Sequence, residues 1–251
     1  KSLEQLDGIT DSQQIDLLTR LAAAYQAIGM HKQVFPTLDK ALNLAEQTQD
    51  PGRNALALSQ LSDAWLSIGD TQEALSLANS SVEDARNAKE ASVLARALNS
   101  QGNALAILQN YPEALEAYKE SVYVSATANE VALAMKASLN QINAALRHSS
   151  FNEVLKLLDD LQPQIEQMPN NHAKTASLIS YGVLALRLLE EDKLLEKDQQ
   201  VMQNLLKEPN LSEAERQFAQ KILQKPGLTQ AQVQQTILSA NSAFSTAAPI
   251  A

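Results

Sequence analysis

A short string of the form Ala-Tyr-Gln-Ala-Ile-Gly recurs at a constant interval, and it constrains the fold more than any other feature of the sequence. Related strings begin at Ala24, Ala64, Ala104 and Ala144, with no slippage in the spacing. This period of roughly 40 residues falls in the range of about 20–50 that is typical of solenoids and other repeat arrays. Each unit of such an array packs only on its neighbours. The repeat therefore predicts a stack of similar units.

The composition favours helices as the building material of these units. The chain of 251 residues is 45% hydrophobic but contains only seven Gly, eight Pro and 4% aromatic residues. Its abundant Ala, Leu, Gln and Glu are good helix formers. Apolar residues also recur three and four positions apart, which is the spacing of one helical face. The sequence therefore predicts an all-α fold.

Turn signals divide each unit into two helices. In the first unit Thr10 is a candidate N-cap, Gly29 ends the first helix, and a second helix is expected over 31–48. Units of this kind are predicted at residues 12–50, 52–90, 92–130, 132–170 and 173–206. The fifth unit is expected to turn at Glu190-Glu191-Asp192. Two helices within 211–244 are expected to cap the array, and residues 245–251 to form a tail.

Small residues occupy the positions where two helices of a unit would approach closely. In the second and third units these are Ser62, Ala74 and Ser81, and Gly102, Ala114 and Ser121. The fourth unit departs from the pattern, with Ile142 and Leu161 at two such positions. A large side chain there would push the helices apart.

This pattern resembles the tetratricopeptide repeat (TPR), in an extended variant with a 40-residue period. Such variants occur in polarity-scaffold proteins and in bacterial arrays joined to a caspase-like domain. The resemblance covers roughly residues 12–206. It implies a right-handed α-solenoid of helix-turn-helix repeats, here with C-terminal capping helices.

Charge and the length of the apolar stretches argue against nucleic-acid binding and membrane insertion. The formal net charge is −9 and the chain has no Cys. Nucleic-acid binding needs clustered Lys and Arg, and anionic membranes attract the same residues. No apolar stretch reaches the roughly 18 residues of a membrane-spanning helix. We therefore expect neither nucleic-acid binding nor membrane insertion.

The first residue, Lys1, is not an initiator Met and no signal-like apolar region follows it, so we expect an excised or processed piece. A cytoplasmic location is favoured, and a periplasmic or exported one stays open if a signal was removed.

No catalytic or metal-binding motif stands out. His31, His148 and His172 fall in or near predicted turns, without a second His or a carboxylate at a spacing that would share a metal ion. The sequence also lacks a Gly-rich phosphate loop and a nucleophile elbow. We therefore predict a chain that is not an enzyme and that needs no cofactor or metal.

Polar side chains share one strip on the first helices of the units, which line the concave face of a solenoid. The predicted groove residues are Gln60, Asp63, Arg96, Asn99, Asn103, Lys136, Asn140 and Asn143. Asn side chains both donate and accept, so they can bracket the backbone of an extended peptide. Arg96 and Lys136 suit acidic side chains or a terminal carboxylate. The strip predicts a scaffold that binds a peptide or protein segment.

Two alternatives stay open. The array could be a regulatory or recruitment domain of a larger enzyme, such as a caspase-like protease, and a gene that continues past Ala251 would favour this. It could also self-associate into a homo-oligomer through apolar residues such as Ile237 and Leu238 on a terminal helix. The sequence does not name the partner.

Overall fold

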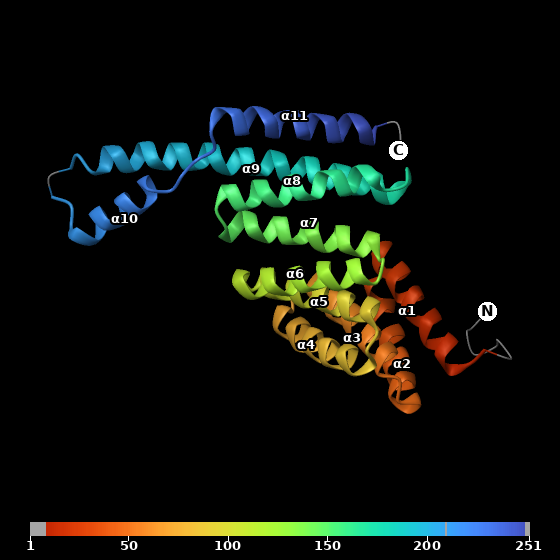
Figure 1. Cartoon of the computed structure of the whole chain (residues 1–251). Coiled ribbons are helices and arrows are strands. Elements are labelled where there is room, and N and C mark those ends of the chain that lie inside the picture. The colour runs from red at the N-terminus through yellow and green to blue at the C-terminus, as the bar shows by residue number, and fades with distance from the viewer. Residues whose placement is uncertain (1–8, 209, 249–251) are drawn as a thin grey trace. The chain divides into compact units, whose positions relative to one another are not determined.

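The computed structural model describes residues 9–208 and 210–248, and every regular element within them is a helix (Figure 1). The eleven helices are α1 (Asp11–Ala27), α2 (His31–Thr48), α3 (Pro51–Ile68), α4 (Thr71–Ala88), α5 (Ala91–Ile107), α6 (Tyr111–Thr127), α7 (Val131–His148), α8 (Phe151–Gln167), α9 (His172–Leu205), α10 (Glu213–Leu223) and α11 (Gln230–Ala247). The predicted all-α class is confirmed. No described helix is long and apolar enough to cross a membrane.

The chain divides into two compact units. The first unit is Lys1–Gln141 and the second is Ile142–Ala251, so the division falls inside α7. The predicted grouping into a five-unit array, a cap and a tail remains a prediction.

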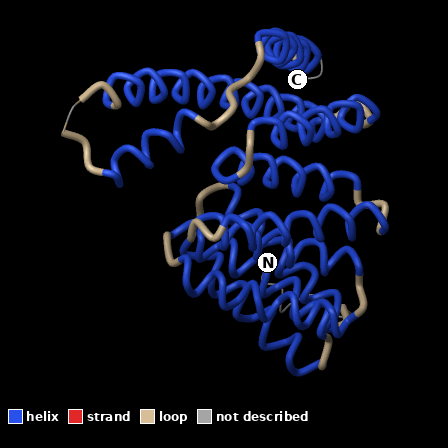
Figure 2. The backbone as a smooth tube through the Cα atoms, turned by 60° about the vertical axis from the view of Figure 1, so that its left-hand side comes forward, coloured by secondary structure: helices blue, strands red, loops and turns tan. Residues whose placement is uncertain are grey.

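The first unit is a stack of antiparallel helix pairs joined by short loops (Figure 2). The pairs are α1 with α2, α3 with α4, and α5 with α6. The first helices also pack on one another, α1 on α3 and α3 on α5, whereas the described parts of α2, α4 and α6 contact each other little. Since the first helices are the more closely packed row, they lie on the concave side of this unit.

Turns repeat in the first unit at the same interval as the strings in the sequence. Six residues adopt left-handed backbone angles at the ends of helices: Gly29, Gly69 and Gln109 after first helices, and Gln49, Lys89 and Asn129 after second helices. A left-handed residue lets the last carbonyls of a helix find backbone donors, which ends the helix. The predicted Gly29 stop and the Thr10 N-cap, which forms a capping box with Gln13, are both confirmed.

Small residues do hold the helices of the first unit close together. The Ser81 hydroxyl donates to the carbonyl of Ala55 at 2.7 Å, and at the equivalent position of the next pair Ser121 donates to Ala95 at the same distance. Each buried hydroxyl thus has a hydrogen-bond partner on the backbone of the neighbouring helix, as buried polar groups generally do. A Cβ placed on Gly102 would lie 2.6 Å from the Tyr118 ring. The close approach that the sequence predicts is therefore present.

Two aromatic side chains of the first unit, Phe35 and Trp65, pack against its core. Trp65 packs edge-to-face on Phe35, with ring centroids 4.9 Å apart, and both border the cluster around Leu38 and Ala64. Apolar burial of this kind supplies most of the stability of a helix pair.

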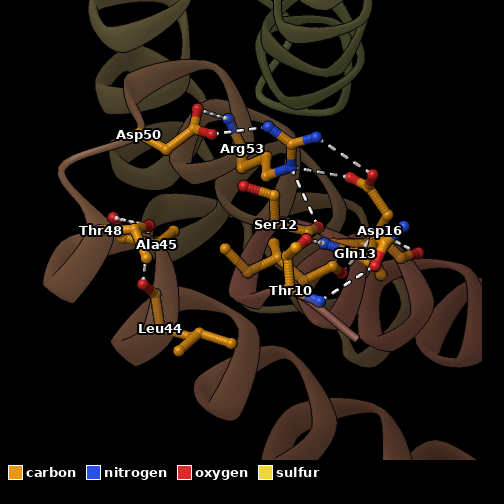
Figure 3. A network of polar contacts seen from close by, with 11 residues as sticks. Thr10, Ser12, Gln13, Asp16, Leu44, Ala45, Thr48, Asp50 and Arg53 are labelled. Carbon is orange, nitrogen blue, oxygen red and sulfur yellow. Dashed lines mark hydrogen bonds and ion pairs between the residues drawn. The ribbon is translucent and has the colours of Figure 1, made fainter. Parts of the chain in front are cut away.

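An arginine joins the first two helix pairs at their edge (Figure 3). The Arg53 guanidinium binds the Asp16 carboxylate of α1 at 3.0 Å and Asp50, the N-cap of α3, at 2.6 Å. Burial would raise the pKa of Asp50, but the hydrogen bonds and charge of Arg53 outweigh it and hold that pKa below its usual value. The network therefore fixes where α3 begins relative to α1.

The second unit departs from the repeat at α9. The turn predicted at Glu190-Glu191-Asp192 is wrong, because these residues lie inside a continuous helix of 34 residues. At about 1.5 Å per residue such a helix is roughly 51 Å long. Asp192 is buried and accepts a 2.7 Å hydrogen bond from the Leu228 backbone N–H. The side chain that suggested a solvated turn instead anchors a distant loop.

The last helix packs along α9 and takes the place of a return helix (Figure 1). The Phe244 ring of α11 lies against Gly182, where a Cβ would come within 2.7 Å of it. Gln199 on the far half of α9 donates to the carbonyls of Ile222 and Lys225 and so holds the end of α10. The final helix also extends to Ala247, so the start of the predicted tail is helical, and residues 249–251 lie outside the described part.

Candidate functional site

The structure divides the predicted groove residues between the two units. Gln60 and Asp63 lie on α3, Arg96, Asn99 and Asn103 on α5, and Lys136 and Asn140 on the part of α7 that belongs to the first unit. Asn143 belongs to the second unit, where its amide oxygen accepts from Arg187 of α9. The first-unit residues are called the groove cluster below.

The amides of the groove cluster are bonded to one another. Asn140 donates through Nδ2 to the amide oxygens of Asn99 at 3.0 Å and Asn103 at 3.1 Å. The Tyr118 hydroxyl also donates to the Asn103 oxygen, at 2.9 Å. Asn99 is buried as well. The Asn strip that the sequence predicts as a row of free peptide-binding groups therefore also ties α5 to α6 and α7.

Two cations of the cluster face solvent. Arg96 and Lys136 stand one repeat period apart, at equivalent positions of α5 and α7, and both are exposed. Within the described residues neither forms a hydrogen bond or an ion pair. An exposed cation that forms no internal hydrogen bond can bind a carboxylate through charge-assisted hydrogen bonds.

Two acceptors of the cluster are buried without a donor. They are the Gln60 oxygen Oε1 and the Asp63 oxygen Oδ1, one turn apart on α3. An acceptor that loses its water on folding and finds no partner costs about 1–3 kcal/mol. Both side chains remain half-buried rather than fully enclosed. The floor of this face therefore offers oxygens that need donors.

Burial dominates the electrostatics of Asp63. It raises the pKa of that carboxyl above its usual value, although the charge of Lys136 and hydrogen bonds from Ser100 and Asn103 act in the opposite direction. Because the folded-state pKa lies above the unfolded value, this group favours folding only while it is protonated. Its contribution is fully present below the unfolded pKa and is lost as pH rises through the folded pKa. The stability of the folded chain therefore falls as pH rises above the unfolded pKa of this carboxyl.

Sequence reasoning missed two members of this site. Tyr118 is not among the predicted groove residues; its ring is buried against Gly102, but its hydroxyl reaches the groove cluster. Burial, and then the negative charge of Asp63, raise its pKa, so the hydroxyl stays a donor. Ser100, which lies beside Asp63, was also overlooked. Tyr118 stands at a position where the first, second and fourth repeats carry Leu38, Ala78 and Leu158. This Tyr was the available signal, since a buried Tyr usually finds a polar partner for its hydroxyl.

The second unit carries a different kind of surface. A hollow of about 450 Å³ lies between the α7–α8 turn, α9 and the end of α10. Two of the charged residues that line it, Arg147 and Glu191, form an ion pair at 3.6 Å. Within the described residues, no group of three or more His, Asp or Glu side chains could hold a metal ion.

Paired helices in register, small residues at the helix contacts and left-handed stops at the repeat interval define a TPR-like helical repeat. Comparison with solved structures agrees on the fold. The Rap protein complexed with Competence and Sporulation Factor is 14% identical with a TM-score of 0.63, over 99% of this chain and 68% of Rap. Pseudomonas aeruginosa PilF is 15% identical with a TM-score of 0.54, over 95% and 94% of the two chains.

A third similar structure is that of the TPR-like repeats of a kinesin light chain from Podosopora anserina. It is 16% identical with a TM-score of 0.56, over 90% of this chain and 96% of the other. No family model matches the sequence. A search of curated proteins finds no match either. The chain therefore has the fold of TPR proteins, and sequence identities this low show the fold alone.

Proposed function

We propose that this protein is a non-catalytic scaffold that binds a peptide or protein segment on the groove cluster of its first unit. The observation that carries the proposal is the pair of exposed, unpaired cations, Arg96 and Lys136, beside a row of Asn side chains on the concave side. A concave row of first helices is where solenoids commonly bind extended ligands.

The chemistry of the face suits an extended segment that carries an acidic group. Arg96 and Lys136 would take that group, either an acidic side chain or a terminal carboxylate. The internal bonds among Asn99, Asn103 and Asn140 hold their amides in fixed orientations, which lowers the entropy lost when they bind a backbone. The Rap structure contains a bound factor, and this supports a ligand-binding role for a fold of this kind.

Selection from a phage-displayed library of random linear peptides tests the proposal on the full chain. Peptides that are enriched would be synthesised with a fluorophore and their affinity measured by anisotropy. We expect the double variant Arg96→Glu/Lys136→Glu to weaken binding at least about tenfold, because both charge-assisted contacts become repulsive.

The matched control is Lys32→Glu/Lys40→Glu, which makes the same change in net charge on the exposed side of α2. It should bind as the wild-type chain does. The proposal is wrong if no peptide is enriched, or if both double variants bind the enriched peptides with wild-type affinity.

A further inference from the structure

We propose that the segment bound by the groove cluster carries an arginine whose guanidinium is held by Asp63 and Gln60. This inference rests on the proposed function, and it names the second charge that the ligand must have. The starting observation is that Asp63 Oδ1 and Gln60 Oε1 are buried without a donor on the same face of α3.

The two acceptors belong to residues three apart on α3. Residues three apart on a helix are neighbours on its surface, with Cβ atoms about 5–6 Å apart. An Arg guanidinium presents five N–H donors in a planar fork, so one group can satisfy two acceptors. A Lys ammonium is a compact point charge that fits this pair of acceptors less well.

No residue in the described part of the chain forms an ion pair with Asp63. The charge of Lys136 acts to lower the pKa of Asp63, yet the Lys136 ammonium forms no ion pair with that carboxylate among the described contacts. Burial disfavours the ionised carboxyl of Asp63, and the surrounding donors do not offset it. A cation delivered by the ligand would give the Asp63 carboxylate the ion-pair partner that the described residues do not provide.

The same geometry explains why the ligand should carry both signs of charge. When an acidic group of the ligand occupies Lys136, the positive charge of Lys136 no longer favours the Asp63 carboxylate to the same extent. A guanidinium at Asp63 restores the balance. The groove cluster therefore selects a segment with an acidic group toward Arg96 and Lys136 and an arginine toward α3.

A double-mutant cycle tests this inference with peptides enriched on the wild-type chain. The protein is changed by Asp63→Asn and the peptide by replacement of its Arg with Gln, and the four affinities are measured by anisotropy. We expect each single change to weaken binding at least about tenfold and the double change to weaken it little further, because both remove the same contact.

Asp39→Asn is the control, since it removes one negative charge from the exposed side of α2 and should leave affinity unchanged. Circular dichroism confirms that each variant remains folded. Gln60→Leu gives an independent check, because it removes the second acceptor without a change in charge, and it should also weaken Arg peptides more than their Gln counterparts.

Three results would overturn the inference while the proposed function stands. The enriched peptides could lack an Arg, they could carry Lys in its place with equal affinity, or the cycle could be additive, as expected if water satisfies Asp63. A library that yields no binding peptide would instead contradict the proposed function itself.

Discussion

The two units of this chain use the same kinds of residue for different packing. In the first unit Gly102 receives Tyr118 from the next helix along the chain, and Ser81 and Ser121 tie neighbouring helices through identical hydrogen bonds. In the second unit Gly182 receives Phe244 from the last helix, with α10 lying between the two in the sequence. The glycine contact in the first unit thus joins consecutive helices, whereas that in the second unit joins helices that are not consecutive in the sequence.

The change coincides with the loss of small residues at the contact positions. Ile142 stands at the repeat position that Ser62 and Gly102 occupy in earlier repeats. Leu161 stands at the position of Ser81 and Ser121, and both large side chains are buried. Large apolar side chains bury more surface but hold helices further apart than serine does. We infer that the repeat register persists only where small residues occupy the contacts between helices. Three predictions test this inference.

The largest effect is expected at the helix contact of the first unit. Gly102→Val should destabilise the chain by about 3 kcal/mol, because the new side chain meets the Tyr118 ring and α5 and α6 must separate. Denaturant unfolding followed by circular dichroism measures the loss.

Two variants sharpen that result. Gly182→Val should act locally, releasing α11 while the first unit keeps its stability. Gly52→Ala should cost almost nothing, although its Cβ also comes within 2.7 Å of a neighbour, because that neighbour is the flexible end of Glu90. Equal losses for all three variants would show that the two units do not pack differently.

An intermediate effect is expected where α9 anchors the last helix. Asp192→Ala should cost about 1–3 kcal/mol, because it leaves the Leu228 N–H without its acceptor. Hydrogen exchange should accelerate over residues 226–247 and stay unchanged in α5. Asp192→Asn keeps an acceptor oxygen and should cost less. Exchange that rises equally in both units would contradict a local anchor.

The smallest effect is expected at the helix stops. Gln109 has a φ of 63°, so Gln109→Gly should stabilise the chain by about 0.5–1 kcal/mol, since Gly adopts that conformation without strain. Ser149 is the equivalent position of the second unit and is not among the described left-handed residues. Ser149→Gly should therefore give no gain. Thermal unfolding of both variants distinguishes them, and a gain at both positions would mean that the register continues past α7.

The sequence alone determined the helices of the first unit and the turns between them. Caps, helical periodicity and left-handed stops depend on residues within one or two turns, so Thr10, Gly29 and the small residues at 62, 81, 102 and 121 predicted them correctly. The use of the predicted groove residues on α3, α5 and the first part of α7 as a binding site stays a prediction.

Tertiary structure alone decided what those side chains do. Whether Asn140 bonds to Asn99, whether Asp63 finds a donor and whether Asp192 turns the chain or anchors a loop all depend on residues far along the chain or on helices beyond the nearest neighbour. A local pattern carries no information on such partners, because burial and pairing are set when separate helices meet.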